Sequence, residues 1–344
     1  MRVGLYYDLR NPPEWRRDWT HMYGHTLESI EEAERQGIGS VWVTEHHMFE
    51  DGYMGQPLQI CAAIAVRTSR VRIGTAVILA PLHPAIDIAE QAATVDILSG
   101  GRLELGLGAG YRVPEFTVYG ADVGRRFELL EERVAEVRRL WAQDIATPPP
   151  VQDPLPLWLG VMGPRGARMA GRLGTGLLWL GDKLLEPYER GLQQGGHDPT
   201  TRRQGGLANF ILADDPEAAL ARVAPHITYQ RDSYNRYGAE GRADGSTGAL
   251  TVTGGPVDVE SLRERVNPPT SPGFDVVTPD EAISRLSAWL GDRPVTDIFL
   301  WATIAGMPDE VADRHCELVA TVLAPALADV GVATGSASTT GASS

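Results

Sequence analysis

The chain has 344 residues, of which 43% are hydrophobic and 22% charged, and its formal net charge is −14. This composition is typical of a globular protein with a sizeable core, and it excludes a disordered or fibrous chain. The acidic balance and the lack of any Lys/Arg run argue against nucleic acid and membrane surfaces as partners. An anionic cofactor must therefore be held locally, by backbone N–H groups and one or two arginines.

A cytoplasmic location is expected from the start of the chain and from its cysteines. The first eight residues already have a strand pattern and lack the basic and apolar segments of a secretory signal. Cys61 and Cys316 have no CxxC spacing and lie in apolar helical patterns. We expect both to be small buried residues with reduced thiols.

Short apolar or β-branched runs alternate with amphipathic helical stretches up to about residue 330, which is typical of parallel βα units. The crossover helices that the apolar spacing predicts are Glu28–Gln36, which Gly37 would end, Ala85–Leu98 and Phe127–Trp141. Eight strands are expected, at Arg2–Tyr7, Ser40–Thr44, Val71–Leu79, Arg102–Leu107, Leu155–Gly160, Gly176–Trp179, Leu207–Leu212 and Thr296–Trp301. A doubly wound open sheet shares this alternation, but eight strands suit a closed (β/α)8 TIM barrel.

The pattern does not stop and restart, so a single domain over residues 1–331 is expected. Two stretches break the rhythm and are interpreted as insertions: the proline-rich Ala146–Pro156 and the Gly-, Ser-, Thr- and Pro-rich Gly238–Thr278. The second comes just before the last βα unit, where a barrel places loops over its catalytic face, so it is predicted to be a lid. Residues 332–344 lack apolar content and are predicted to be a disordered tail.

The run Glu45-His46-His47 directly follows an expected strand. In a parallel α/β barrel the C-terminal ends of the strands open onto the catalytic face. A histidine there can exchange a proton, donate to an anion or bind a metal, and Glu45 can orient either ring. The alternative is a pair of satisfied polar residues at a strand end. A metal site is set aside, because successive strand residues point to opposite faces and no second cluster shows ligand spacing.

A second candidate segment has glycines at every other position, Gly106, Gly108 and Gly110. This spacing is not the dinucleotide-binding fingerprint. The glycines permit close approach of a flat ligand, and a strand bend beside a tight turn explains them equally well. The residues of this segment that we expect to contact a cofactor are Gly108, Ala109, Tyr111 and Arg112.

The third candidate segment is a strand end, Leu159-Gly160, followed by a glycine-rich helix start with Pro164 near its first turn. Such a start presents unpaired N–H groups and the positive end of the helix dipole to a phosphate, and Arg165 can add charge. The alternative is an ordinary helix start with solvated arginines.

Together, and in this order, the segments resemble the bacterial-luciferase-like flavin monooxygenases, most of all the luciferase α-type chains. The likeness spans nearly the whole chain. It rests on Pro12-Pro13-Glu14, Glu45-His46-His47 with Glu50, Gly52, Gly55 and Pro57, Gly74-Thr75, His83-Pro84, Ala89-Glu90, Gly101-Arg102, Gly110 with Phe116 and Gly120, Thr278-Pro279-Asp280-Glu281 and Pro325.

The resemblance implies a (β/α)8 barrel that binds reduced FMN at its C-terminal mouth. The isoalloxazine would lie against Thr75, Ala76 and Val77, and a non-proline cis peptide that is frequent in the family would map to Ala76-Val77. The residues that would hold the phosphate are Met162, Gly163 and Gly166, with Arg165 beside them. The residues expected to line the substrate pocket are Phe49, Tyr53 and Trp179.

By the same resemblance, His46 is the catalytic histidine, with Glu45 beside it, and it assists formation or breakdown of a flavin C4a-peroxide. The implied activity is an FMNH2-dependent monooxygenase that uses O2 on a lipophilic carbonyl or aromatic small molecule. No NAD(P)H-binding motif is visible, so a separate reductase is expected to supply the flavin. A homodimer is the default assembly.

One departure from the family pattern keeps other functions open. Ala109 stands where luciferase α chains carry an arginine that contacts the phosphate. The deazaflavin F420, which related barrels bind in the same place, is therefore the alternative cofactor, and the reaction would then be hydride transfer without oxygen. A further alternative is a non-catalytic flavin-binding partner subunit, against which the retained Glu45-His46-His47 argues.

Overall fold

The barrel is a ring of parallel strands, and the computed structural model describes it over residues 1–240, 273–291 and 293–328. Its strands run in the order β3-β2-β1-β11-β8-β7-β6-β5-β4, and a β3–β5 pairing closes the ring. Because β3 and β4 share one position, eight strand positions result, and the predicted (β/α)8 barrel is confirmed. The strands are β1 (Arg2–Tyr7), β2 (Ser40–Val43), β3 (Arg72–Thr75), β4 (Ile78–Leu79), β5 (Leu103–Gly108), β6 (Leu157–Gly160), β7 (Gly176–Leu178), β8 (Gln204–Leu207) and β11 (Val295–Trp301).

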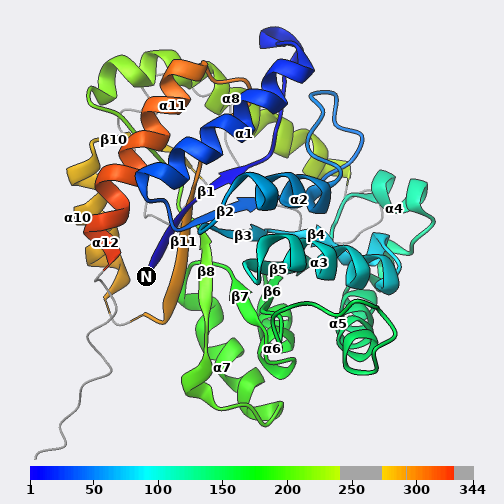
Figure 1. The fold of residues 1–344 in the computed structure, drawn as a ribbon. Helices are drawn as coiled ribbons and strands as arrows, with labels where there is room; N and C mark the ends of the chain where they lie inside the picture. The colour runs from blue at the N-terminus through cyan, green and yellow to red at the C-terminus, as the bar shows by residue number, and fades with distance from the viewer. Residues whose placement is uncertain (241–272, 292, 329–344) are drawn as a thin grey trace, which may run out of the picture.

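Helices surround this ring (Figure 1). The α-helices are α1 (Trp19–Gln36), α2 (Pro57–Arg67), α3 (Ala85–Ser99), α4 (Val113–Tyr119), α5 (Arg126–Ala142), α6 (Pro164–Arg172), α7 (Leu185–Gln194), α8 (Pro216–Glu240), α10 (Pro279–Leu290), α11 (Asp309–Leu318) and α12 (Ala324–Ala328). A π-helical turn, η6 (Val319–Leu323), joins the last two, and 3₁₀ turns lie at η1 (Pro13–Trp15), η2 (Ala80–Leu82), η3 (Val123–Arg125), η4 (Asp182–Leu184) and η5 (Pro199–Thr201).

Helix α1 begins nine residues before the predicted start at Glu28, because the Asp18 side chain caps it by accepting the N–H of His21. Its predicted end is confirmed, since Gly37 adopts the left-handed conformation with φ 105°. Among residues 1–240, 273–291 and 293–328, none of the helices combines the length and the apolar character needed to cross a bilayer.

Two predicted strands were wrong in detail. The run Val71–Leu79 is divided into β3 and β4 by a cis peptide bond at Ala76-Val77, the bond that the family resemblance implied. The run Leu207–Leu212 is also divided: its first residue ends β8, and Phe210–Leu212 forms β9, which pairs outside the barrel with β10 (Asp275–Val277). Alternating apolar residues continue across both breaks, so hydrophobicity alone could not reveal them.

The predicted lid, Gly238–Thr278, was too long at both ends. Its first three residues belong to α8, and its last residues include β10, whose partner β9 could not be recognised from local sequence. Residues 241–272, which make up most of the predicted lid, lie outside the described residues, as does the predicted tail 332–344.

The inside of the barrel is filled by large aromatic side chains opposite glycines. Trp42 and Trp158 are fully buried and meet edge to face, with ring centroids 6.0 Å apart. A Cβ at Gly74 would lie 2.1 Å from the Trp42 ring, and one at Gly176 would lie 2.2 Å from the Trp158 ring. The barrel is therefore a packed core and not a pore.

The N-terminal end of the barrel is closed by ion pairs. Arg2 contacts Asp297 at 2.7 Å and Glu104 at 2.9 Å, and both carboxylates are buried. Because this end is sealed, the C-terminal ends of the strands form the accessible mouth.

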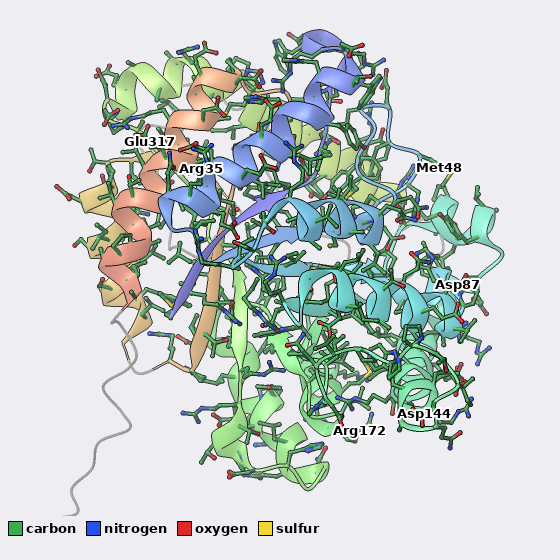
Figure 2. All side chains as sticks on the ribbon, viewed as in Figure 1. Arg35, Met48, Asp87, Asp144, Arg172 and Glu317 are labelled. Atoms are coloured by element: carbon green, nitrogen blue, oxygen red, sulfur yellow. The ribbon has the colours of Figure 1, made fainter. Side chains whose placement is uncertain are left out.

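A larger apolar cluster lies between the barrel and the helices. Cys61 and Cys316 belong to it as free thiols, as predicted, and burial raises the pKa of both, to about 12 for Cys316. The outer faces of the helices are polar, as Figure 2 shows for Arg35, Arg172 and Glu317.

The glycines of β5 make room for the neighbouring strand. A Cβ at Gly106 would lie 1.9 Å from the Thr75 carbonyl oxygen, and one at Gly108 would lie 2.3 Å from Val77 Cγ2. The Thr75 hydroxyl also donates to the Gly106 carbonyl and accepts the Gly106 N–H, both at 2.8 Å. Close packing of β3 and β4 against β5 thus explains these glycines, and a cofactor contact at Gly108 stays a prediction.

We expect Gly106→Ala to lower the free energy of unfolding by about 1–3 kcal/mol, because the added methyl group must displace backbone in a packed sheet. Gly24→Ala is the matched control. A Cβ at Gly24 would meet no described atom within 4 Å, and alanine favours the helix that contains it. Urea unfolding of both variants measures the difference, and equal stability of the two would contradict this packing argument.

Candidate functional site

The candidate site begins where β2 ends at Val43 and the chain turns across the barrel mouth. The backbone of this turn is held by hydrogen bonds from the His46 N–H to the Met54 carbonyl (2.9 Å) and from the Met54 N–H to the Asp8 carbonyl (3.0 Å). Glu45 and His46 are buried behind this turn, whereas Met48 lies exposed at its outer edge (Figure 2). The turn therefore places both predicted catalytic side chains at the mouth.

His46 is paired with Glu115 from the start of α4. The His46 Nδ1 lies 3.0 Å from Glu115 Oε1, which also accepts the backbone N–H of His47 at 2.8 Å. Glu115 is fully buried, and Arg112 lies 3.8 Å from the same oxygen. Because a carboxylate only accepts, it favours the His46 tautomer with a proton on Nδ1, which leaves Nε2 for proton exchange.

Aromatic rings enclose the His46 imidazole. Its centroid lies 4.9 Å from Tyr53, 5.1 Å from Phe49 and 5.4 Å from Tyr111. Burial raises the pKa of the Tyr53 and Tyr111 hydroxyls, so both are neutral phenols at physiological pH. Within the described part of the chain, the Tyr111 hydroxyl and Glu115 Oε2 are buried without a hydrogen-bond partner. These two atoms are therefore available to a ligand.

Helix α8 supplies the outer wall of this enclosure. Tyr237 packs on Phe49 with centroids 3.9 Å apart, and the Tyr234 and Tyr53 hydroxyls are 2.8 Å apart. The Tyr237 hydroxyl also accepts the Glu50 N–H at 3.3 Å. These contacts bring α8 over the loop that carries His46.

Arg10, which follows β1, fixes the same wall from inside. It is fully buried, donates to Asp51 Oδ2 at 2.7 Å and also donates to the Ser233 hydroxyl of α8. The guanidinium lies 5.2 Å from the Tyr53 ring centroid and 5.6 Å from that of Tyr234. Because a buried arginine is costly without partners, this contact holds α8 firmly against the mouth.

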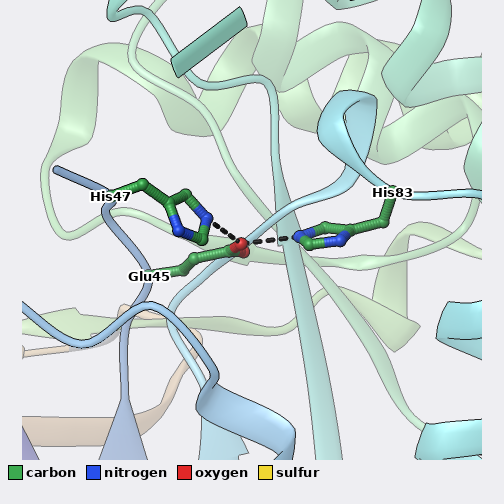
Figure 3. Close-up of side chains that lie close together, drawn as sticks. All are labelled: Glu45, His47 and His83. Atoms are coloured by element: carbon green, nitrogen blue, oxygen red, sulfur yellow. Dashed lines mark hydrogen bonds and ion pairs between the residues drawn. The ribbon is translucent and has the colours of Figure 1, made fainter. Parts of the chain in front are cut away.

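Glu45 contacts two imidazoles, those of His47 and His83 (Figure 3). Its Oε1 lies 2.7 Å from His47 Nε2 and 2.6 Å from His83 Nε2, while its Oε2 accepts the Leu79 N–H at 2.6 Å. Burial raises the pKa of the Glu45 carboxyl, but the hydrogen bonds from His47, His83 and Leu79 outweigh burial and lower it to about 2. Glu45 is therefore a carboxylate that ties the end of β2 to β4.

The wall opposite this loop is formed by β3 and β4. The Tyr6 hydroxyl donates to the Ala76 carbonyl at 3.0 Å, and the Ala76 N–H donates to the Val43 carbonyl at 2.6 Å. Thr75 is fully buried, whereas Ala76 and Val77 are half-buried. The two half-buried residues are the part of this wall that a flat ring can contact.

The predicted phosphate site is the start of α6, after β6. Gly163 precedes Pro164, and among the described residues no side chain caps the helix. A Cβ at Gly163 would meet no described atom within 4 Å, and Met162 is 46% exposed. Arg165 is exposed on the first turn. Uncapped N–H groups beside open space suit an anionic group.

A family model described as luciferase-like monooxygenase matches residues 1–324. The chain belongs to this family. The predicted family membership is thereby confirmed.

Relatives within the luciferase-like monooxygenase family differ in cofactor. An F420-dependent glucose-6-phosphate dehydrogenase of Amycolatopsis mediterranei is 34% identical over 45% of this chain and 53% of its own length. The oxygenase component of a flavin-dependent trigonelline monooxygenase of Acinetobacter baylyi is 28% identical over 54% of this chain and 57% of its own length. The chain thus spans little more than half the length of these curated relatives.

The crystal structure of a monooxygenase from Streptomyces bottropensis has the same fold. It superposes with a TM-score of 0.76 at 24% sequence identity, and the match covers 94% of this chain and 99% of that one. The likeness supports the barrel assignment over almost the whole chain.

The structure brings together some of the residues that the sequence singled out for this luciferase-like site. His46, Phe49, Tyr53 and Tyr111 form one enclosure, and Arg112 lies beside it with its guanidinium 4.9 Å from the Phe49 centroid. Trp179 is separate, because it follows β7, which is four strand positions from β2 in either direction. A role of Trp179 in a shared pocket stays a prediction.

Ala109 is buried in the large apolar cluster, 7% exposed. The other cofactor candidates, Gly166 among them, lie on the segments described above. A Cβ at Gly166 would lie 2.7 Å from Val161 Cβ, so packing alone already requires this glycine. Contact of these residues with a cofactor stays a prediction.

Sequence reasoning missed the partners of the two histidines. Glu115 was visible only as an acid just after the glycine-rich segment, and His83 only as a histidine before Pro84. It also set a metal site aside, because no second cluster showed ligand spacing in the sequence. Glu45 and His47 lie in the turn after β2, where their side chains meet, and His83 joins them from the loop after β4.

Proposed function

We propose that the protein is the oxygenase component of a two-component flavin monooxygenase. It would receive FMNH2 from a separate reductase and use O2 to oxidise a lipophilic carbonyl or aromatic small molecule. The observation that carries this proposal is the buried His46–Glu115 pair inside an aromatic enclosure at the barrel mouth. An enclosure that excludes water protects oxygen chemistry from side reactions.

The residues present fit a flavin at two places. The Tyr111 hydroxyl and Glu115 Oε2 are buried polar atoms that lack partners among the described residues. The uncapped start of α6, with Arg165 on its first turn, suits the phosphate. When bound, the reduced isoalloxazine supplies the electrons that activate O2.

The side chains of the enclosure have distinct tasks in this proposal. Glu115 orients the His46 ring, and His46 Nε2 holds or moves the proton that the reaction requires. Phe49 and Tyr53 exclude water from that nitrogen, together with the cover that α8 provides. A histidine that is already oriented and desolvated needs no reorganisation during the reaction.

Hydride transfer with F420 is the second candidate, and two observations favour it. Ala109 supplies no cation where luciferase α chains carry arginine, and the dehydrogenase relative of Amycolatopsis mediterranei uses F420. In that case His46 would act as the acid or base for the substrate. A non-catalytic partner subunit is less well supported, since such a subunit would not need an oriented histidine.

Side-by-side titration under anaerobic conditions with FMNH2 and with reduced F420 tests the proposal. We expect FMNH2 to bind at least about tenfold more tightly, a difference of about 1.4 kcal/mol, and admission of O2 to give rapid flavin oxidation. Tighter binding of F420, with oxidation that needs an organic substrate and consumes no O2, would establish the hydride-transfer alternative instead.

The same titration with oxidised FMN and riboflavin locates the phosphate. Arg165→Ala is expected to weaken FMN binding about tenfold, as the loss of a hydrogen bond to a charged group does, and to leave riboflavin binding unchanged. Arg168→Ala, an exposed arginine of the same helix, is the matched control.

A further inference from the structure

We propose that Glu45, His47 and His83 form a binding site for a divalent transition-metal ion, of which Zn²⁺ is the best match. The three residues come from two segments, the end of β2 and the loop between β4 and α3, and their side chains converge on one point (Figure 3). One possible ligand atom from each residue lies within 4.8 Å of the others, and Glu45 Oε1 is the atom that contacts both His47 Nε2 and His83 Nε2.

The ligand set and its spacing suit zinc. Two imidazoles and one carboxylate make up the protein ligands of several catalytic zinc sites, with metal–ligand bonds of about 2.0–2.2 Å. Tetrahedral ligands at that distance are about 3.3 Å apart. Glu45 Oε1 is 2.7 Å and 2.6 Å from the two imidazole nitrogens, so each of these two separations would widen by about 0.6–0.7 Å to admit the ion.

The surroundings of the three residues resemble those of a built metal site. Glu45 Oε2 is anchored by the Leu79 N–H, which leaves Oε1 to face the imidazoles. The Tyr119 hydroxyl lies 3.2 Å from His47 Nδ1, the usual place for a group that orients a metal-bound imidazole. The His47 and His83 side chains are 10% and 21% exposed, so an ion and a fourth, water ligand can reach the site.

Metal binding at this site requires a change of imidazole tautomer but no redox step. In the metal-free protein each Nε2–H donates to Glu45 Oε1, whereas a metal ion needs the Nε2 lone pair. The Nε2 proton of each imidazole therefore moves to Nδ1 through solvent. At His47 that Nδ1–H can then donate to the Tyr119 oxygen. Binding replaces two hydrogen bonds to one carboxylate oxygen by three metal–ligand bonds.

Zinc binding to the purified full-length protein, measured by calorimetry and by competition with a chromogenic chelator, tests this inference. We expect one tightly bound Zn²⁺ per chain in the wild type, and an affinity more than about tenfold lower in His83→Ala, since even an outer-sphere partner contributes 10–100-fold. His25→Ala is the control, because the half-buried His25 lies beside Asp313 (3.2 Å) and offers zinc a competing site outside the cluster.

Visible absorption of the Co²⁺-loaded wild-type protein tests the site without the need for a folded variant. Co²⁺ in a four-coordinate nitrogen and oxygen site should give intense visible bands, and Zn²⁺ should abolish them. The inference is overturned if the wild type binds no metal, if His83→Ala retains the affinity, or if His25→Ala loses it. Since no turnover is measured, failure here leaves the proposed function untouched.

Discussion

Replacing His46 by alanine is expected to lower the turnover rate by about 10²–10⁴-fold, the range that a positioned acid–base group contributes. The substitution removes the imidazole that contacts Glu115 and is enclosed by the rings of Phe49 and Tyr53. In the variant, Glu115 Oε1 still accepts the backbone N–H of His47. Stopped-flow kinetics with the cofactor identified by titration measures the effect, and thermal unfolding checks that the variant is folded.

Two further variants separate chemistry from packing. Glu115→Gln keeps the shape of the side chain but not its charge, so we expect a smaller loss of kcat than in His46→Ala. His197→Ala, an exposed histidine outside the enclosure, should behave like the wild type. If His46→Ala retains turnover within about threefold of the wild type, His46 does not handle the proton, and a non-catalytic subunit becomes the better interpretation.

The sequence was sufficient to place His46 but not its partners. A polar run directly after a strand of a parallel barrel must emerge at the mouth, and this rule needs only local pattern. Glu115 lies 69 residues further along the chain, and its contact with His46 depends on how α4 is placed against the β2 loop. That placement is a tertiary property, so periodicity carried no signal for it.

The glycine-rich segment shows a different limit. Gly106 was equally compatible with ligand approach and with a bend in a strand, because both need the same missing side chain. Only the position of the Thr75 carbonyl oxygen, 1.9 Å from the place that a Cβ at Gly106 would take, decides in favour of packing. Likewise, the division of Leu207–Leu212 into β8 and β9 depends on β10, whose Asp275 pairs with Phe210 from a distant part of the chain.

A buried histidine that the sequence did not single out provides the second large prediction. His315 in α11 is fully buried, and its Nδ1 accepts the Leu212 N–H at 2.8 Å while its Nε2–H donates to the Trp301 carbonyl at 2.9 Å. These backbone groups belong to β9 and β11, which lie in separate sheets. His315 thus satisfies two backbone groups and joins the barrel to the β9–β10 pair.

Burial lowers the pKa of His315 to about 4, against its ordinary 6.5. As the pH falls, the unfolded chain takes up a proton near pH 6.5, whereas the folded chain does so only near pH 4. The contribution of neutral His315 to stability is therefore complete above pH 6.5 and is lost between pH 6.5 and 4. A shift of this size corresponds to about 3 kcal/mol of the free energy of unfolding.

His315→Gln is the decisive comparison, because glutamine keeps one donor and one acceptor but does not titrate. At about pH 7.5 we expect the variant to be about 1–3 kcal/mol less stable than the wild type, owing to imperfect hydrogen bonds to Leu212 and Trp301. Urea unfolding at about pH 7.5, 5.5 and 4.5 should show this gap narrowing as the wild type loses stability. His197→Gln serves as the exposed control. If the difference in the free energy of unfolding between the wild type and His315→Gln stays constant over this pH range, His315 takes up its proton at the same pH in the folded and unfolded chains. Its role would then be packing alone.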